Sequence, residues 1–244
     1  GINISKEEWE AGAKNCPECG SILVLKATKG SDTDMELELN PELRKIFIVT
    51  SHRCPVCGID DDHIYVSGSA YTVKEDLLDL MPVYKWIKHE FSVYKIAAFN
   101  VWQCQSCGFT AIREYYEDPV QDTALTLTLF RHAVERIFKE NEETARIFAF
   151  LKDKPGIGNT NLALEIKRLL MAIYILENIE KIRKEDSVSL GRTYVRLSWA
   201  LREFEALNAG EKEKTMLELN DTFKAFSKIW PDCPTSEENA LNVS

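Results

Sequence analysis

Six of the seven cysteines in this chain form pairs with one spacing, and a glycine follows each pair. We call residues 16–20, 54–58 and 104–108 the first, second and third knuckles. A tight turn can point two thiols three positions apart at one metal ion, and the glycine lets that turn close where a side chain would clash or φ must be positive. Two knuckles would supply the four thiolates of a tetrahedral zinc site. Chance pairs or a disulfide framework would not repeat the glycine, so the pattern predicts structural zinc.

The predicted ligands are the thiols of all three knuckles: Cys16, Cys19, Cys54, Cys57, Cys104 and Cys107. One four-thiolate site would leave two thiols for a second, partial or histidine-assisted site. We expect the first knuckle to pair with the second, because that loop is shorter to close. His52, two residues before the second knuckle, is a candidate substitute ligand. The run Asp60-Asp61-Asp62-His63 could hold another metal, although a solvated acidic turn is the commoner account of such a run.

Short apolar runs flank the knuckles and predict the strands that position them. Period-two or β-branched patterns occur at residues 22–25, 35–39, 46–49, 64–66 and 100–102. This order of strand, knuckle and turn is typical of a zinc ribbon. Residues 73–88 predict a helix around Leu77, Leu80 and Tyr84, and residues 93–96 predict a further strand.

The pattern changes after Asp118-Pro119, where apolar residues begin to recur with a helical period. Helices are predicted around residues 127–137, 147–151, 162–179, 190–207 and 216–226. Residues 154–159 contain a proline and two glycines and predict a break between helices. They are not a phosphate-binding loop, because no Gly-Lys-Ser/Thr follows.

These patterns predict an α+β protein in two regions. Residues 1–118 would form a zinc-ribbon-like domain of small strands, and residues 119–244 an all-α antiparallel array of the tetratricopeptide sort. With 244 residues and 45% hydrophobic content, the chain can bury one large core or two smaller ones. It contains no apolar run near the roughly 20 residues that span a bilayer, and we find no signal-peptide pattern. Paired cysteines suit a reducing compartment, so we expect a cytoplasmic location.

The charge is unevenly distributed between these regions. Residues 1–118 hold 12 Lys/Arg against 19 Asp/Glu, a net of −7, and residues 119–244 hold 18 against 20, a net of −2. Non-specific nucleic-acid affinity comes mainly from Lys and Arg contacts to phosphates. The acidic balance therefore counts against a nucleic-acid-binding ribbon.

Several segments resemble a known family. The Cys-Pro-x-Cys-Gly at residues 16–20, Asp32-Thr33-Asp34, the stretch at residues 100–111 and the aromatic segment at residues 196–203 are similar to the bacterial domain-of-unknown-function family 2225. The resemblance covers about residues 16–230. It implies metal-binding knuckles followed by tetratricopeptide-like helices, with no established activity. The sequence has three knuckles where the family leads us to expect two, and the extra one is either the second or the third.

We therefore expect a zinc-binding interaction module whose helical region binds a partner protein and which has no catalytic site. Arg168, Arg192, Arg196 and Arg202 lie at spacings that could line the binding face. The alternatives are a dithiol redox protein and a nucleic-acid-binding ribbon. A thioredoxin-like dithiol needs a thiolate at a helix N-terminus beside a βαβ unit, whereas glycine and short strands follow each knuckle here.

Overall fold

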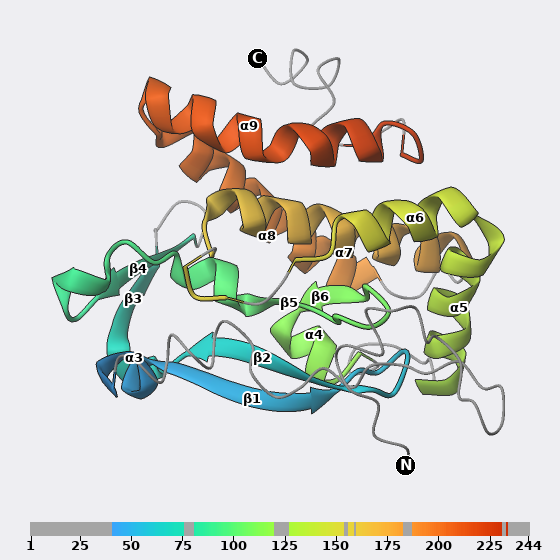
Figure 1. The fold of residues 1–244 in the computed structure, drawn as a ribbon, viewed down its shortest axis with the longest axis horizontal. Helices are drawn as coiled ribbons and strands as arrows, with labels where there is room; N and C mark the ends of the chain where they lie inside the picture. The colour runs from blue at the N-terminus through green and yellow to red at the C-terminus, as the bar shows by residue number, and fades with distance from the viewer. Residues whose placement is uncertain are drawn as a thin grey trace, which may run out of the picture.

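The computed structural model describes residues 41–75, 81–119, 127–153, 156–158, 160–182, 187–230 and 233. The first knuckle and the strands expected at residues 22–25 and 35–39 lie outside this part of the chain. Small antiparallel strand pairs occupy the N-terminal part and helices follow, which confirms the predicted α+β class. Figure 1 shows the first hairpin along the lower edge of the molecule and the last helix along the upper edge.

Three two-stranded antiparallel sheets make up the strand region. After the short helix α3 (Pro41–Ile46), β1 (Phe47–Arg53) pairs with β2 (Asp60–Val66), and the 3-10 turn η1 (Gly68–Ala70) leads to β3 (Tyr71–Glu75) and β4 (Pro82–Trp86). The 3-10 turns η2 (His89–Phe91) and η3 (Ile96–Asn100) precede β5 (Val101–Gln103), which pairs with β6 (Thr110–Ile112). The strands expected at residues 46–49, 64–66 and 100–102 are therefore present, although β1 ends and β2 begins four residues beyond the predicted bounds.

Two predictions for this region are wrong. The helix expected over residues 73–88 is replaced, where the structure describes it, by the β3–β4 pair. Strand formation there suits the β-branched and aromatic residues, and Pro82 is tolerated because it begins β4. The strand expected at residues 93–96 is a turn between η2 and η3, and Ile96 is the buried residue of that stretch, so the alternating burial of a strand is missing.

The helical region follows the short helix α4 (Arg113–Glu117). It comprises α5 (Leu127–Glu140), α6 (Glu142–Phe150), α7 (Leu162–Ile182), α8 (Ser187–Ala206) and α9 (Ala209–Phe226). Each of the five predicted helical segments therefore has a matching helix. Asn141 and Asn208 cap α6 and α9 by accepting backbone N–H groups, and Glu211 completes a capping box at α9. Among the described residues, no helix is long and apolar enough to cross a membrane.

Helix α7 is the centre of the fold. Leu169, Leu170, Met171, Ala172 and Ile173 follow one another in the chain and are all fully buried, so the helix is enclosed on every side rather than along one stripe. It contacts α5, α8 and α9 and also the strands β5 and β6. Helix α9 packs mainly against α7. The helices thus surround a central helix, and the tetratricopeptide-like order predicted from the sequence stays unconfirmed.

One hydrophobic core joins the strand region to the helices. It contains Cys54 and Val56 of the second knuckle, Cys104 of the third, and buried residues from β5, β6 and helices α4 to α9. A smaller core lies under α3, β1 and β2, around Phe47, Phe99 and Ile157. Residues on both sides of position 118 therefore contribute to the larger core.

Candidate metal centre

The second and third knuckles are turns of one geometry, each closing a hairpin. In the second, the amides of Cys54 and Gly58 donate to the carbonyls of Ile59 and Cys54, both at 2.9 Å. The third repeats this pattern from Cys104 to Phe109 at 2.8 Å and from Gly108 to Cys104 at 2.9 Å. The two glycines have φ values of 73° and 80°. Both glycines therefore occupy the left-handed region that the motif predicts.

The two turns bring four thiols together. The sulfur atoms of Cys54, Cys57, Cys104 and Cys107 all lie within 4.8 Å of one another, and we call this group the thiol cluster. The Sγ atoms of Cys54 and Cys107 are 3.7 Å apart, and those of Cys57 and Cys104 are 3.6 Å apart. Four sulfurs placed about 2.3 Å from a central ion in a tetrahedron would be about 3.8 Å apart. The cluster therefore has the shape of a four-thiolate metal site.

The thiol cluster lies partly inside the protein. Cys54 and Cys104 are fully buried, Cys107 is half-buried and Cys57 is exposed. Hydrogen bonds from the thiols of Cys104 and Cys107 lower the pKa of Cys54 to about 4, whereas the interactions with Cys104 and Cys54 raise the pKa of Cys107. The thiolate form of Cys54 is thus stabilised by its neighbours. A metal ion bound by four thiolates would displace the protons of the thiols, so its binding would release protons.

Side chains from the helical region hold both knuckles in place. Arg131 of α5 donates to the Pro55 carbonyl at 2.6 Å. Lys152, just after α6, donates to the carbonyls of Gln105 and Ser106 at 3.2 and 2.9 Å. These cations also place positive charge beside a cluster that would carry excess negative charge with a divalent ion bound. The helices therefore contribute directly to the metal centre.

Side-chain contacts also join the β1–β2 hairpin to the β5–β6 hairpin. Asp61 of β2 accepts a hydrogen bond from the Gln105 amide at 2.5 Å, and burial raises the pKa of Asp61 to about 6. The His63 ring stacks on Trp102 with centroids 4.6 Å apart and planes 3° from parallel. Burial lowers the pKa of His63 to about 3, so this ring is neutral in the core. Asp61 and His63 thus join hairpins together rather than forming the solvated turn or second metal site considered from the sequence.

The predicted ligands divide into two groups. Cys54, Cys57, Cys104 and Cys107 come together, whereas Cys16 and Cys19 lie outside the described residues. Among the described residues, the second knuckle lies against the third, whereas loop length had favoured a pairing with the first. The entropic difference between closing the two loops is only about 0.2 kcal/mol, and the shared core outweighs it. His52 is not part of the metal-binding group found among the described residues, and its Nε2 lies 3.7 Å from Glu117 Oε1.

The arginines expected on a binding face differ in their surroundings. Arg168 is buried and donates from Nη1 to the Val101 carbonyl at 3.0 Å, so its predicted place on a binding surface is wrong. The burial of Arg168 could not be predicted from its spacing, because α7 is enclosed on all sides. Arg196 is half-buried and pairs with Glu114 at 3.2 Å, and Arg192 and Arg202 are exposed.

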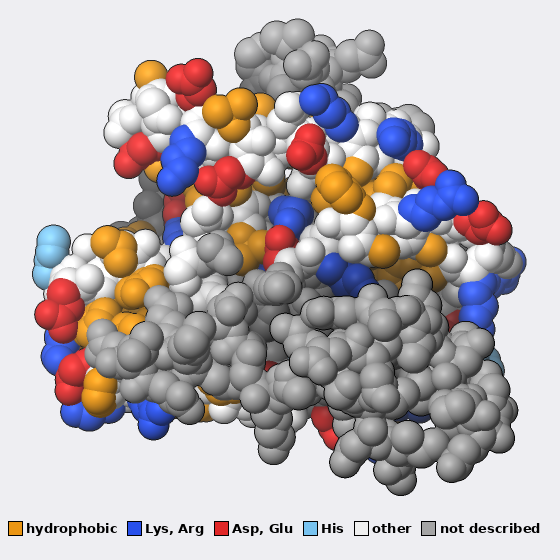
Figure 2. Space-filling model, viewed as in Figure 1, with side chains coloured by type: hydrophobic (Ala, Val, Ile, Leu, Met, Phe, Trp, Pro, Cys, Tyr) orange, Lys and Arg blue, Asp and Glu red, His pale blue; other side chains and the backbone are white. Residues whose placement is uncertain are grey.

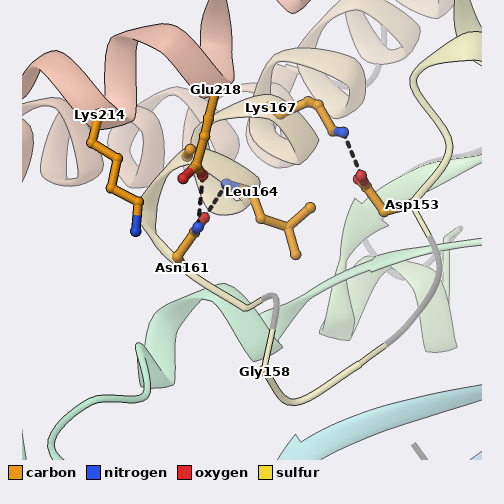
Figure 3. Close-up of a pocket in the computed structure, with 8 residues that line it drawn as sticks. Asp153, Gly158, Asn161, Leu164, Lys167, Lys214 and Glu218 are labelled. Atoms are coloured by element: carbon orange, nitrogen blue, oxygen red, sulfur yellow. Dashed lines mark hydrogen bonds and ion pairs between the residues drawn. The ribbon is translucent and has the colours of Figure 1, made fainter. Parts of the chain in front are cut away.

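A polar cavity of about 480 Å³ lies between the start of α7 and α9, and we call it the α7–α9 pocket (Figure 3). Asn161 accepts from the Leu164 amide and donates to Glu218 at 2.7 Å, while Lys167 pairs with Asp153 at 2.5 Å. Lys214 of α9 also lines the pocket (Figure 3). Sequence reasoning recognised only a helix break here, because the residues that meet come from separate segments.

Comparison with known proteins identifies the family. No curated protein and no solved structure gave a significant match to this chain. Residues 48–230 match the family described as "Uncharacterized protein conserved in bacteria (DUF2225)". The matched region includes the thiol cluster and the helices α5 to α9, and it begins after the first knuckle. The chain belongs to the DUF2225 family, as the segments quoted from its sequence suggested.

Proposed function

We propose that the thiol cluster binds one structural zinc ion and that the chain is a non-catalytic interaction module. The observation that carries the proposal is the approach of four thiols from two hairpin turns to separations that suit a tetrahedral ion. Four protein ligands leave no open position for substrate, which is typical of structural rather than catalytic zinc. A reducing compartment such as the cytoplasm would keep these thiols available.

The same turns favour zinc over dithiol redox chemistry. Reactive Cys-x-x-Cys pairs use a helix N-terminus to stabilise a thiolate, whereas each of these pairs closes a β-hairpin. Nucleic-acid binding is disfavoured by the acidic balance of the chain. In addition, Figure 2 shows basic and acidic side chains interspersed over the visible helical surface rather than gathered in a basic patch.

Metal analysis of the reduced, full-length protein tests the zinc proposal. We expect at least one zinc per chain, and replacement of Cys104 and Cys107 by serine should remove it. The matched control replaces Cys16 and Cys19, which should leave the ion of the thiol cluster in place. Any metal lost from that control would belong to a second site at the first knuckle. Well under one zinc per chain in the wild type would contradict the proposal.

The interaction role is supported by the α7–α9 pocket, which displays charges of both signs at the surface of the helical region. We propose that a partner protein docks over this pocket. Charge reversal at Lys214 should weaken capture of a partner from the native organism, whereas reversal at Lys224, also exposed on α9, should not. Equal capture by both variants would place the interaction elsewhere.

A turnover that is lost with the thiol cluster while the fold persists would overturn the non-catalytic role.

A further inference from the structure

A second cavity, of about 240 Å³, lies between α7, α8 and β4, and we call it the α7–α8 pocket. Arg196, Trp199, Ala200 and Glu203 of α8 line it, together with Glu165 of α7 and Tyr84 of β4. Along α8, the other three residues lie three, four and seven positions after Arg196, so all four share one face of the helix. This face belongs to the aromatic segment at residues 196–203, for which neither the metal centre nor the partner surface provides a role.

Glu165 is the unusual member of the pocket. Its side chain is buried at 6% exposure, and within the described part of the chain its Oε2 atom has no hydrogen-bond partner. Leaving a buried polar atom unsatisfied is destabilising, and more so when the group is charged. Burial raises the pKa of Glu165 to about 7, and Lys95 and Arg196 oppose that shift. Glu165 therefore brings an incompletely hydrogen-bonded carboxyl group to the wall of this cavity.

The two cations near Glu165 are already engaged. Lys95 forms an ion pair with Glu203, and Arg196 forms one with Glu114 at 3.2 Å. Among the described residues around the pocket, these two ion pairs use Glu203 and Glu114 as their acidic groups. Glu165 is the acidic group that neither cation neutralises by an ion pair. A cationic ligand would complete this arrangement, whereas an anionic ligand would meet the carboxylates of Glu165 and Glu203.

The remaining walls suit the carbon part of such a ligand. Trp199 and Tyr84 are half-buried aromatic side chains on the pocket wall, and aromatic faces attract both alkyl chains and cations. No metal-binding group is present here among the described residues, since their candidate cluster comprises only the four cysteines. We propose that the α7–α8 pocket binds a primary alkylammonium group, which donates to the Glu165 carboxylate and packs its carbon chain against Tyr84 and Trp199.

This chemistry is shared by a free alkylamine and by a lysine side chain, and binding to the zinc-loaded full chain distinguishes them. Calorimetry at pH 8 would compare pentylammonium with a lysine capped at both ends. Pentanol and pentanoate serve as the neutral and anionic controls. We expect saturable binding of at least one amine, at least tenfold tighter than pentanol or pentanoate. Tighter binding of capped lysine points to a protein side chain as the natural ligand, and tighter binding of pentylammonium points to a small amine.

Three variants test the assigned roles. Glu165→Gln keeps the shape of the side chain but removes its charge, and should weaken amine binding at least tenfold. Trp199→Leu should weaken it several-fold while the preference for amine over pentanol persists. Glu205→Gln, an exposed change on the same helix, is the matched control and should bind as the wild type does. Absence of saturable amine binding, or equal binding by wild type and Glu165→Gln with both folded, would overturn the proposal.

Discussion

Two glycines show how single residues shape the metal centre. A Cβ atom added at Gly58 or Gly108 would meet its nearest neighbour at 3.6 Å, which is ordinary contact. Space is therefore available, and the requirement for glycine comes from the positive φ angles of 73° and 80°. Alanine in this left-handed region is strained by roughly 1–2 kcal/mol. The glycine that follows the cysteine pair in the second and third knuckles thus has a backbone explanation.

Replacing Gly108 by alanine should lower the free energy of unfolding by about 1–2 kcal/mol because of this strain. Chemical denaturation of the zinc-loaded protein measures the change. The matched control is Gly191→Ala in α8, where a Cβ atom meets nothing within 4 Å and alanine is the better helix former. That control should be at least as stable as the wild type. If both variants had equal stability, backbone strain would not be the reason for the glycine.

The buried carboxyl of Glu165 should make stability depend on pH. Its pKa is about 7 in the folded chain against an ordinary 4.5, so the folded state keeps a proton that the unfolded state has lost between these values. The stabilisation of the folded state by this proton is fully present below pH 4.5. It is lost as the pH rises to about 7, which lowers the free energy of unfolding by about 3 kcal/mol. Denaturation of wild type and Glu165→Gln from pH 4.5 to 8 should show the wild type losing stability relative to the variant. Parallel pH profiles would contradict this.

At the scale of elements, the helices support the knuckles. The Arg131 side chain of α5 donates to the Pro55 carbonyl inside the second knuckle. Outer hydrogen bonds of this kind orient metal ligands, and their loss commonly weakens metal binding by 10- to 100-fold. We expect Arg131→Gln to weaken zinc binding by about tenfold in a chelator competition. Lys139→Gln, an exposed change on the same helix, is the control and should leave the affinity unchanged. Equal affinities would limit α5 to a packing role.

Chelation should disturb more than the strands. Because the larger core includes both cysteine turns and α7, loss of zinc should increase hydrogen exchange in β1, β2, β5 and β6 and also along α7, which packs on β5 and β6. Mass spectrometry of the exchanged protein would locate these changes, and added zinc should reverse them. Exchange that rises in the hairpins while α7 keeps full protection would instead indicate independent regions.

The sequence was most informative about local features of these elements. Cysteine spacing predicted the two turns, and periodicity predicted the helices α5 to α9, because both depend on nearby residues. The short helices α3 and α4 were not predicted. The β3–β4 pair was mistaken for a helix because Leu77, Leu80 and Tyr84 happen to share a helical spacing. The pairing of knuckles and the pocket around Glu165 were not predictable, since both depend on residues that meet only after α7 has packed.

At the scale of the whole molecule, the shared core bears on how the chain unfolds. Position 118 separates strand-rich from helical sequence, yet buried residues from both sides contribute to the larger core. We therefore expect one cooperative transition for the zinc-loaded protein, reported equally by far-ultraviolet circular dichroism of the helices and by tryptophan fluorescence. Separate midpoints for the two signals would show that residues 1–118 and 119–244 unfold as distinct domains.

The separation of the two cysteine turns along the chain also has a consequence during protein synthesis. Cys57 and Cys104 are 47 positions apart, and α7, which packs on the β5–β6 hairpin, comes later still. At roughly 5–20 residues per second, a ribosome would release the second pair of thiols some 2–10 s after the first. For that interval the nascent chain holds a half-built site whose thiols are open to oxidation or to competing metals. Rapid zinc supply during translation would therefore raise the yield of correctly loaded protein, whereas zinc added after release would have to enter a chain that had already collapsed.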